Sequence, residues 1–275
     1  MIQNKSKNHH FIPQFYIKGF ADLNNNVYMY NTLYKKINKT PKKSAQIFYQ
    51  EDLHTAKLFG EKTAMIEDFY SGLEGHLSKL ISEINNISNN YPPEVFSSWK
   101  YDDSIYKVLM LIVSVQFWRN PKNKELAEKM AEKLNLLYEN AICDNSDILF
   151  FEKKDIKYIY KKRKTESMKK VIQFLVLPLI TFKFTSETIP NLQVIKIKDY
   201  DKDLICSDNP VYISEMNDQF IVTGDFIFPL TKDILLTNIK NIDYDEIQKT
   251  MILNASEKVI GSSVELLDYL THKTY

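Results

Sequence analysis

Residues 108–118 constrain the fold most, because a helix over this segment is apolar on every face. The segment reads VLMLIVSVQFW and is stopped by Asn120 and Pro121. A helix without a polar side is usually central in a domain, where other elements cover it. The chain has the material for such a core, since 44% of its 275 residues are apolar.

Around this segment the sequence predicts a small N-terminal β element, a helical middle region and a strand-rich C-terminal third. Apolar residues from Ile66 to Ile84 recur every three or four positions, which predicts an amphipathic helix that begins near Thr63. Asp103 or Ser104 is suited to cap the apolar helix that follows. Further helices are expected at residues 14–20, 126–141, 155–174 and 247–260, and short strands at residues 27–30, 193–197, 204–206, 211–213, 219–222 and 234–236.

This order of elements predicts an α+β fold, because strands and helices do not alternate as they do in βαβ units. We expect a single α+β domain over residues 1–275, with a subdomain boundary near residues 185–191. Residues 264–269 would close the fold as a strand or a short helix.

The composition excludes several classes of protein. With only 6 glycines the chain has no P-loop and no dinucleotide fingerprint, so neither a P-loop nucleotide nor NAD is expected as a cofactor. The net charge of +1 favours neither nucleic acid nor a membrane as partner. Any argument for such a partner must therefore rest on local clusters of charge.

The expected location is the cytoplasm. Cys143 and Cys206 form no CxxC pattern, which indicates two free thiols in a reducing compartment. Residues 1–8 lack the apolar core of a secretion signal. The longest apolar run, residues 171–182, is too short to span a bilayer and is interrupted by Pro178.

Several short motifs occur in one order along the chain. They are HHFIPQFYIKGF at residues 9–20, Glu67 followed by FYSGLEG at 69–75, VSVQFWRNP at 113–121, SDNPV at 207–211 and FPLT at 228–231. Together they resemble the bacterial family called domain of unknown function 4238. The resemblance implies an α+β fold and an intracellular bacterial setting, near mobile elements or antiviral defence genes. It implies no established activity.

The pair His9-His10 is the first candidate site. Neighbouring side chains on an extended segment point to opposite faces, so one imidazole can face a pocket while packing holds the other. In the functional interpretation both are catalytic, as general base and metal ligand, with His10 on the metal. Gln14, in the same motif, is a candidate substrate-binding residue. In the alternative, His10 packs under nearby aromatic residues and His9 lies on the surface.

The beginning of the HHFIP motif is similar to that of some HNH-type nucleases, but the continuation is poor. Such a site needs a second His or Asn on a helix shortly after a hairpin. His54 falls in an expected loop, and His76 lies on a helix long after the expected position.

Glu67 and Glu74 lie seven residues apart and therefore on the same side of one helix. With a histidine nearby they could hold a hard divalent cation, and Glu74 is the candidate catalytic residue and metal ligand. The alternative is a solvated helix edge with ordinary ion pairs.

Gln116 and Arg119 share one face of the apolar helix. They are substrate-binding candidates, because a buried Gln and Arg need partners and an anionic phosphate is one. The alternative is a structural ion pair from Arg119 to Glu74 or Asp208.

Two further motifs complete the candidate set. In the turn Ser207 to Pro210, Asp208 is a candidate catalytic residue and Asn209 a candidate for substrate binding, although every residue there also favours a plain turn. A basic stretch with interleaved tyrosines favours a nucleic-acid strand, or else a solvated helix face; its substrate-binding candidates are Lys161, Lys162 and Arg163. Several more lysines lie in residues 31–48, namely Lys35, Lys36, Lys39, Lys42 and Lys43.

The leading functional hypothesis is a metal-dependent, nuclease-like hydrolase that acts on nucleic acid or a nucleotide phosphate, with a divalent metal as cofactor. The competing hypothesis is a non-enzymatic binding or sensing module, in which the same residues form a recognition or structural network. A nucleotide-dependent group transferase is a third. The catalytic hypothesis requires His9 and His10 to meet Glu74, Arg119 and Asp208 in space.

Overall fold

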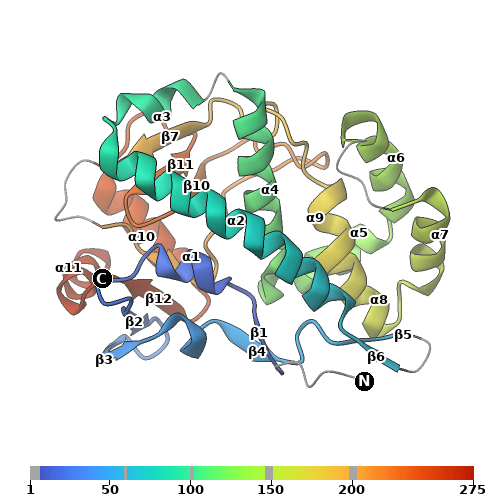
Figure 1. The fold of residues 1–275 in the computed structure, drawn as a ribbon, viewed down its shortest axis with the longest axis horizontal. Coiled ribbons are helices and arrows are strands. Elements are labelled where there is room, and N and C mark those ends of the chain that lie inside the picture. Colours follow the sequence, from blue (N-terminus) through green and yellow to red (C-terminus); the bar gives the residue numbers. More distant parts are fainter. Residues whose placement is uncertain (1–6, 59–60, 100–101, 146–150, 198–202) are drawn as a thin grey trace.

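The computed structural model describes residues 7–58, 61–99, 102–145, 151–197 and 203–275 (Figure 1). The fold is α+β, with an N-terminal β region, a helical middle and a strand-rich C-terminal part. The N-terminal elements are β1 (Asn8–His10), α1 (Gln14–Lys18), β2 (Val27–Asn31), β3 (Lys36–Lys42), the 3-10 turn η1 (Ser44–Gln46), β4 (Tyr49–Glu51), β5 (Ala56–Leu58) and β6 (Glu61–Thr63).

The middle region is helical and begins with the long helix α2, which crosses the front of the molecule in Figure 1. Its elements are α2 (Met65–Asn90), α3 (Glu94–Ser98), α4 (Asp103–Arg119), the 3-10 turn η3 (Pro121–Asn123), α5 (Lys124–Ala131), α6 (Leu134–Asn145), α7 (Lys153–Lys162), α8 (Glu166–Val171), the π-helical turn η4 (Ile172–Val176) and α9 (Leu177–Ile180). No helix in the described part of the chain combines the length and apolarity that crossing a bilayer requires.

The C-terminal part completes two antiparallel sheets. Its elements are β7 (Gln193–Lys196), β8 (Cys206–Ser207), β9 (Tyr212–Ile213), β10 (Phe226–Pro229), β11 (Ile234–Thr237), α10 (Tyr244–Asn254), β12 (Lys258–Gly261) and α11 (Val264–Thr274). One sheet has the strand order β7-β11-β10-β9, and the other has the order β3-β2-β12-β8. The second sheet therefore joins the N-terminal hairpin β2–β3 to strands from the far end of the chain.

The apolar helix α4 lies between two clusters of buried side chains. Its middle residues, such as Met110 and Val113, belong to a cluster that also contains the strands, whereas Val115 and Trp118 pack with the helices α5 to α9. The Trp118 indole donates a hydrogen bond to Thr181 Oγ1 at 2.7 Å, which ties α4 to the end of α9. The prediction that other elements cover this helix is confirmed by its buried residues.

The two ends of α4 are closed by polar side chains. At the N-terminus the carboxylate of Asp102 accepts the backbone N–H groups of Ser104 and Ile105, so the cap is one residue earlier than expected. At the C-terminus the side-chain amide of Gln173, on the π-helical turn η4, donates to the carbonyls of Trp118 and Asn120. These bonds satisfy carbonyl groups that a helix end leaves without a partner.

Several expected helices are shorter or divided in the structure. The helix expected at 126–141 is divided into α5 and α6. The helix expected at 155–174 is divided into α7, α8 and η4. The helix expected at 247–260 ends at Asn254, and residues 258–261 form β12, which pairs with β2 and β8. The expected strand at 219–222 is reduced to one isolated bridge. Residues 264–269 belong to α11, one of the two expected alternatives.

Residues on both sides of positions 185–191 contribute to the same apolar cluster, which runs from Ile12 to Leu270. Cys206 is a buried free thiol within this cluster, and burial raises the pKa of that thiol. The side chain of Cys143 lies outside the described part of the structure.

Asp208 fixes the turn that leads into β12. Its two carboxylate oxygens accept the backbone N–H groups of Ser256, Glu257 and Lys258 at 2.7 to 3.0 Å. Burial raises the pKa of Asp208, although these three hydrogen bonds oppose the shift. The side chain is thus occupied by backbone groups of a turn.

We expect Asp208→Ala to lower the free energy of unfolding by about 2 kcal/mol, because three backbone donors lose their acceptor. Urea denaturation checks this, with Asp218→Ala as the control. Asp218 is exposed, so its replacement should change stability by less than about 0.5 kcal/mol. Equal effects of the two substitutions would contradict the structural role of Asp208.

Candidate functional site

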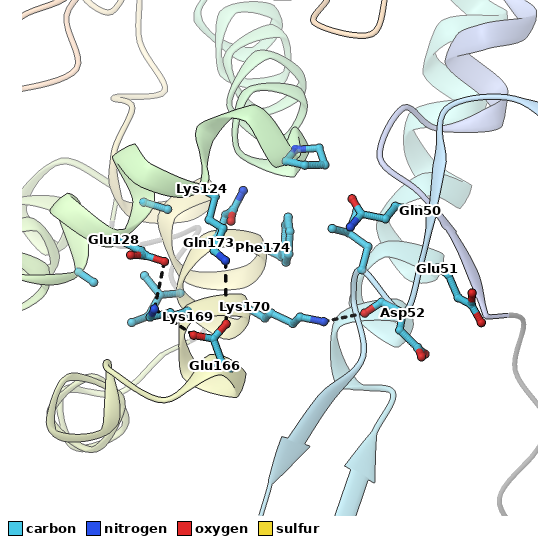
Figure 2. Close-up of a pocket in the computed structure, with 15 residues that line it drawn as sticks. Gln50, Glu51, Asp52, Lys124, Glu128, Glu166, Lys169, Lys170, Gln173 and Phe174 are labelled. Atoms are coloured by element: carbon cyan, nitrogen blue, oxygen red, sulfur yellow. Dashed lines mark hydrogen bonds and ion pairs between the residues drawn. The ribbon is translucent and has the colours of Figure 1, made fainter. Parts of the chain in front are cut away.

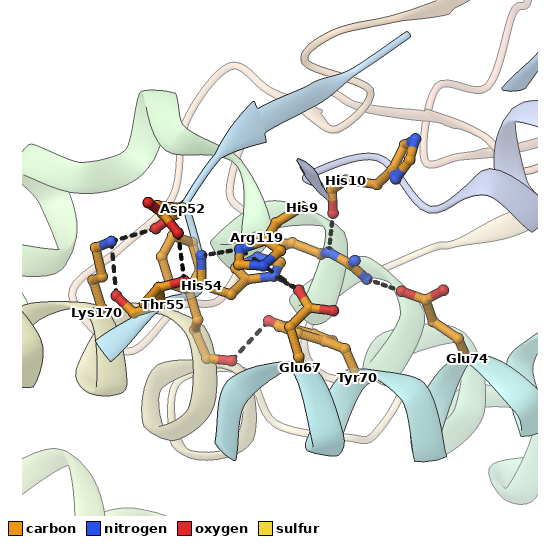
Figure 3. A network of polar contacts seen from close by, with 11 residues as sticks. His9, His10, Asp52, His54, Thr55, Glu67, Tyr70, Glu74, Arg119 and Lys170 are labelled. Carbon is orange, nitrogen blue, oxygen red and sulfur yellow. Dashed lines mark hydrogen bonds and ion pairs between the residues drawn. The ribbon is translucent and has the colours of Figure 1, made fainter. Parts of the chain in front are cut away.

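Three polar side chains meet where β1, the turn after β4 and the first turn of α2 come together (Figure 3). They are His9, His54 and Glu67. Strand β1 pairs antiparallel with β4, with His9 opposite Gln50, so the turn that follows β4 lies beside His9. Residues far apart in the sequence thereby form one polar cluster, which we call the His-His-Glu cluster.

The two imidazoles of this cluster lie face to face. Their ring centroids are 5.3 Å apart, and the ring planes differ by 8°. The backbone N–H of His54 donates to Nδ1 of His9 at 2.9 Å, so this nitrogen of His9 carries no proton. Both side chains are buried.

His54 also contacts the carboxylate of Glu67, with 2.5 Å between its Nδ1 and Oε1 of Glu67. The pKa of His54 is lowered from 6.5 to about 4, mainly by burial and also by the nearby charge of Arg119, although the bond to Glu67 opposes the shift. His54 is therefore neutral at pH 7 and donates its Nδ1 proton to the carboxylate.

Glu67 is the exposed member of the cluster, since 26% of its side chain meets solvent. Burial acts to raise its pKa, but the hydrogen bond from His54 and the charges of His54, His9 and Arg119 outweigh that effect and lower it. Glu67 is thus an ionised carboxylate at neutral pH. It connects two buried imidazoles with the surface.

The second ring nitrogen of His54, Nε2, is buried and has no hydrogen-bond partner among the described residues. The ring is 0% exposed and packs against Tyr70 and Phe174, with centroid distances of 5.1 and 5.0 Å. The Tyr70 hydroxyl cannot serve Nε2, because it donates to the backbone carbonyl of Phe174 at 2.7 Å. A buried polar atom without a partner is costly and marks a position worth explaining by function.

Arg119 lies next to this cluster and joins three elements. Its Nε donates to the carbonyl of His10 at 2.8 Å, and its Nη1 contacts Oε1 of Glu74 at 2.5 Å. The guanidinium also lies over the ring of Tyr70, 4.2 Å from the centroid. Only 3% of the Arg119 side chain is exposed. The arginine therefore fixes the end of α4 to β1 and α2.

The turn that carries His54 is held from the other side by Lys170 of α8. Its ammonium group donates to the carbonyls of Asp52 and Thr55 at 2.6 and 3.0 Å (Figure 3). Burial lowers the pKa of Lys170. The turn is thus fastened between α8 and β1, which limits the freedom of the His54 ring.

A cleft of about 240 Å³ lies on the far side of the same turn (Figure 2). Its walls come from β4 and the following turn, from α5, and from α8 with η4, and they include Leu53, Lys124, Lys169, Lys170 and Phe174. Because Phe174 also packs on the His54 ring, this cleft and the His-His-Glu cluster share a wall. The cleft carries charges of both signs, since Lys124 and Lys169 pair with acidic residues.

The His-His-Glu cluster has donor atoms of the kind that bind divalent metals. In the described part of the chain, one ligand atom from each residue lies within 4.8 Å of the others. His9 Nδ1 and His54 Nδ1 lie 3.9 and 2.5 Å from Glu67 Oε1. Zinc ligands sit about 2.0–2.2 Å from the ion, so a cation would replace the shared proton and widen the His54–Glu67 contact. It would also have to displace the backbone N–H of His54 from the single lone pair of His9 Nδ1. The donor set fits Zn²⁺ or a related transition metal better than Mg²⁺.

The burial of the two histidines is the reverse of the alternative in which His10 is packed and His9 lies on the surface. His9 is buried and His10 is the partly exposed residue. The His10 ring packs edge-on against Tyr49, and its Nε2 is buried without a partner in the described structure. Burial lowers the pKa of His10, as does the charge of Arg119, while Glu74 opposes them.

Of the residues expected to converge, His9, His10, Glu74 and Arg119 lie together. Glu74 meets Arg119, as the structural alternative had it, and belongs to no metal-ligand group in the described structure. The carboxylate of Asp208 does not join them, because the turn before β12 takes both of its oxygens. Only the backbone carbonyl of Asp208 comes near, since it accepts a hydrogen bond from Asn120, the residue after Arg119.

The other substrate-binding candidates occupy separate places. Asn209 bonds to Asn254, and Gln14 accepts a long hydrogen bond from Ser44. Gln116 is buried, with no partner for its Oε1 among the described residues. Lys161 and Lys162 are exposed at the end of α7, and Arg163 is paired with Glu132.

The sequence interpretation did not bring His54 and Glu67 together with His9. No local pattern signals this contact, because residues 52–55 form a short turn without periodicity. The pairing of β1 with β4 creates the contact, and two three-residue strands are too short to be predicted from periodicity.

A family model described as "Protein of unknown function (DUF4238)" matches residues 8–263 of the 275 residues. No curated protein and no solved structure matches the chain.

We expect Glu74→Ala to lower the free energy of unfolding by about 3 kcal/mol, because it leaves the buried Arg119 guanidinium without its counter-charge. Urea denaturation measures this change. Glu83→Ala, on the exposed face of the same helix, is the control and should cost less than about 0.5 kcal/mol. A cost for Glu74→Ala as small as that of the control would show that the ion pair does not hold the site together.

The pKa of His54 predicts how stability depends on pH. Between pH 6.5 and about 4 the unfolded chain binds a proton at His54 that the folded protein does not. The free energy of unfolding is therefore not reduced by His54 above pH 6.5. It decreases by about 3 kcal/mol as the pH falls from 6.5 to 4. Urea titrations from pH 7 to 4 should show a shallower decline for His54→Gln than for His76→Gln, the exposed control. Parallel curves would contradict the prediction.

Proposed function

The chain belongs to the DUF4238 family of proteins of unknown function, and on that premise we propose that it is a metal-dependent hydrolase of phosphate esters in nucleic acids or nucleotides. The observation that carries the proposal is the His-His-Glu cluster, in which two buried imidazoles and an ionised carboxylate from separate elements meet within 4.8 Å.

The energetics of the cluster support a function beyond packing. Two imidazoles and a carboxylate lose hydration on burial, and one ring nitrogen of His54 gains no hydrogen bond in return. Apolar side chains of similar size would fill this position at a lower free-energy cost. Groups with strongly shifted pKa values that meet at a partly open position are characteristic of functional sites.

In this proposal, Glu67, His9 and His54 hold a divalent cation, which lowers the pKa of a bound water so that hydroxide forms near neutral pH. The low pKa of His54 keeps its ring neutral, and a neutral ring is the form that binds metals. Arg119 fixes β1 and α2, the elements that carry His9 and Glu67, through its bonds to the His10 carbonyl and to Glu74. Lys170 holds the His54 turn in place.

A second function is favoured by a different observation, the lock formed by Arg119, Glu74 and the His10 carbonyl. These groups are bonded to one another, as expected of a polar network that joins the N-terminal segment to the helices. In that case the protein is a non-enzymatic binding or sensing module. Metal binding separates the two functions, since the module requires none.

The test begins with metal-stripped protein titrated calorimetrically with Zn²⁺, Mn²⁺ and Mg²⁺. The loaded protein is then incubated with DNA, RNA and the small phosphodiester bis(4-nitrophenyl) phosphate. We expect Glu67→Gln and His54→Ala to weaken metal binding and to reduce hydrolysis at least about 100-fold, since ligand loss costs no less than loss of an outer-shell partner.

His76→Ala is the matched control, because His76 is an exposed histidine on the same helix as Glu67. Circular dichroism confirms that each variant is folded. Glu67→Gln is expected to remain folded, because its amide oxygen can still accept the His54 hydrogen bond. A loss of metal binding in this variant would therefore not be due to misfolding. Metal binding and hydrolysis that are equal in Glu67→Gln and in His76→Ala would refute the enzymatic proposal.

A further inference from the structure

The hairpin β2–β3 carries a dense local cluster of positive charge. Between Asp22 and Glu51 there is no acidic residue, yet five lysines occur there, in a chain whose 36 basic and 35 acidic residues nearly balance. The lysines are Lys35, Lys36, Lys39, Lys42 and Lys43. Such a segment creates a positive potential that attracts anionic partners.

The fold displays this charge on an edge. Strand β3 is the outer strand in the order β3-β2-β12-β8, and the side chains of Lys36 and Lys39 are exposed. They line a shallow hollow together with the apolar Met29 and Ile37 and with Tyr34, whose side chain is 79% exposed. We call this surface the hairpin face. It combines cations with an exposed aromatic ring.

The positive charges of the hairpin face are not neutralised by neighbours. Lys36 and Lys39 of this face, and Lys42 farther along β3, form no ion pair with any residue that the structure describes. Three acidic residues of the adjoining elements are paired elsewhere: Glu257 with Lys258, Asp268 with His272 and Asp245 with Lys273.

The basic stretch on α7 is neutralised only in part. Arg163 is bonded to Glu132, and Lys153 is paired with Glu139. Lys154, in the first turn of α7, contacts Glu152 at 2.7 Å. Lys157, Lys161 and Lys162 remain exposed and form no ion pair with a described residue, so α7 also keeps positive charge. We favour the hairpin for a polyanion because the chain leads from β3 into β4, which pairs with the strand that carries His9.

The hairpin face leads toward the His-His-Glu cluster. From the end of β3 the chain passes through η1 into β4, which pairs with the strand that carries His9. Figure 1 shows β3, β4 and β5 in a row along the lower edge of the molecule. Tyr49, on β4, is 41% exposed and offers a second ring along this path.

We propose that the hairpin face binds single-stranded nucleic acid, with phosphates against Lys36, Lys39 and Lys42 and bases stacked on Tyr34. Surfaces that bind single strands combine cations along the backbone with aromatic rings for the bases. The inference extends the proposed hydrolase function by naming a surface for its substrate. It rests on that proposal in one respect only, that the bound strand, which β3 and β4 direct toward the His-His-Glu cluster, is hydrolysed there.

Binding is measured by fluorescence anisotropy with fluorescein-labelled 20-nucleotide DNA and RNA single strands, on full-length protein in EDTA. We expect the dissociation constant of Lys36→Glu/Lys39→Glu to rise at least about ten-fold, with a salt dependence shallower by about 0.7 per lysine lost. Tyr34→Ala should weaken binding about ten-fold with an unchanged salt dependence.

Lys161→Glu/Lys162→Glu is the matched control, with the same change of charge on α7, and should leave the affinity within about two-fold of wild type. An equal loss in the control would show non-specific attraction and overturn the proposal. Unchanged affinity in Lys36→Glu/Lys39→Glu would also overturn the proposal. The lysines would then serve only to keep the edge strand β3 from pairing with another chain. Wild-type protein that binds phosphatidylglycerol vesicles but neither strand would overturn it as well.

The two proposals fail separately. Because EDTA removes metal, strand binding does not depend on the His-His-Glu cluster. Hydrolysis of bis(4-nitrophenyl) phosphate does not require a strand to dock on the hairpin. Loss of strand binding with retained hydrolysis refutes the hairpin face alone, and the reverse result refutes the hydrolase alone.

Discussion

The buried guanidinium of Arg119 is the interaction on which the site depends. It joins the C-terminus of α4, the carbonyl of His10 on β1 and the carboxylate of Glu74 on α2, and it lies over the ring of Tyr70. Because the charge is almost wholly desolvated, each partner is needed, and their loss would expose an uncompensated cation to an apolar interior. The α4 helix that carries Arg119 is itself enclosed, so the arginine cannot move out into water.

Sequence reasoning was most successful where periodicity is strong. The stripe from Ile66 to Ile84 and the apolar run at 108–118 each gave the right helix, because burial of an apolar stripe or of a whole helix leaves a long signal. It failed at residues 258–261, where a short apolar run reads equally well as the end of a helix. That segment is a strand because β2, more than two hundred residues earlier in the chain, offers it an edge to pair with.

Only part of the site could be predicted from the sequence. Arg119 and Glu74 could be paired, since an arginine at the end of a buried helix needs a carboxylate. The partners of His9 could not be found, because residue spacing carries no information about which distant turn a three-residue strand will lie beside. His54 appeared as a loop residue, and its complete burial follows from tertiary contacts with Tyr70 and Phe174 alone.

Helix α2 assigns different roles to two similar carboxylates. Glu67 and Glu74 are seven residues apart and share one face, yet Glu67 meets the imidazoles and Glu74 meets Arg119. The arginine neutralises Glu74, while its field, together with the His54 hydrogen bond, keeps Glu67 ionised against the effect of burial. A carboxylate held as an anion beside two buried imidazoles, one of them kept neutral by burial, can accept a cation once the proton between His54 and Glu67 is displaced. The structural lock and the proposed chemistry are therefore linked, because the lock supplies the electrostatic conditions under which the His-His-Glu cluster can accept a cation.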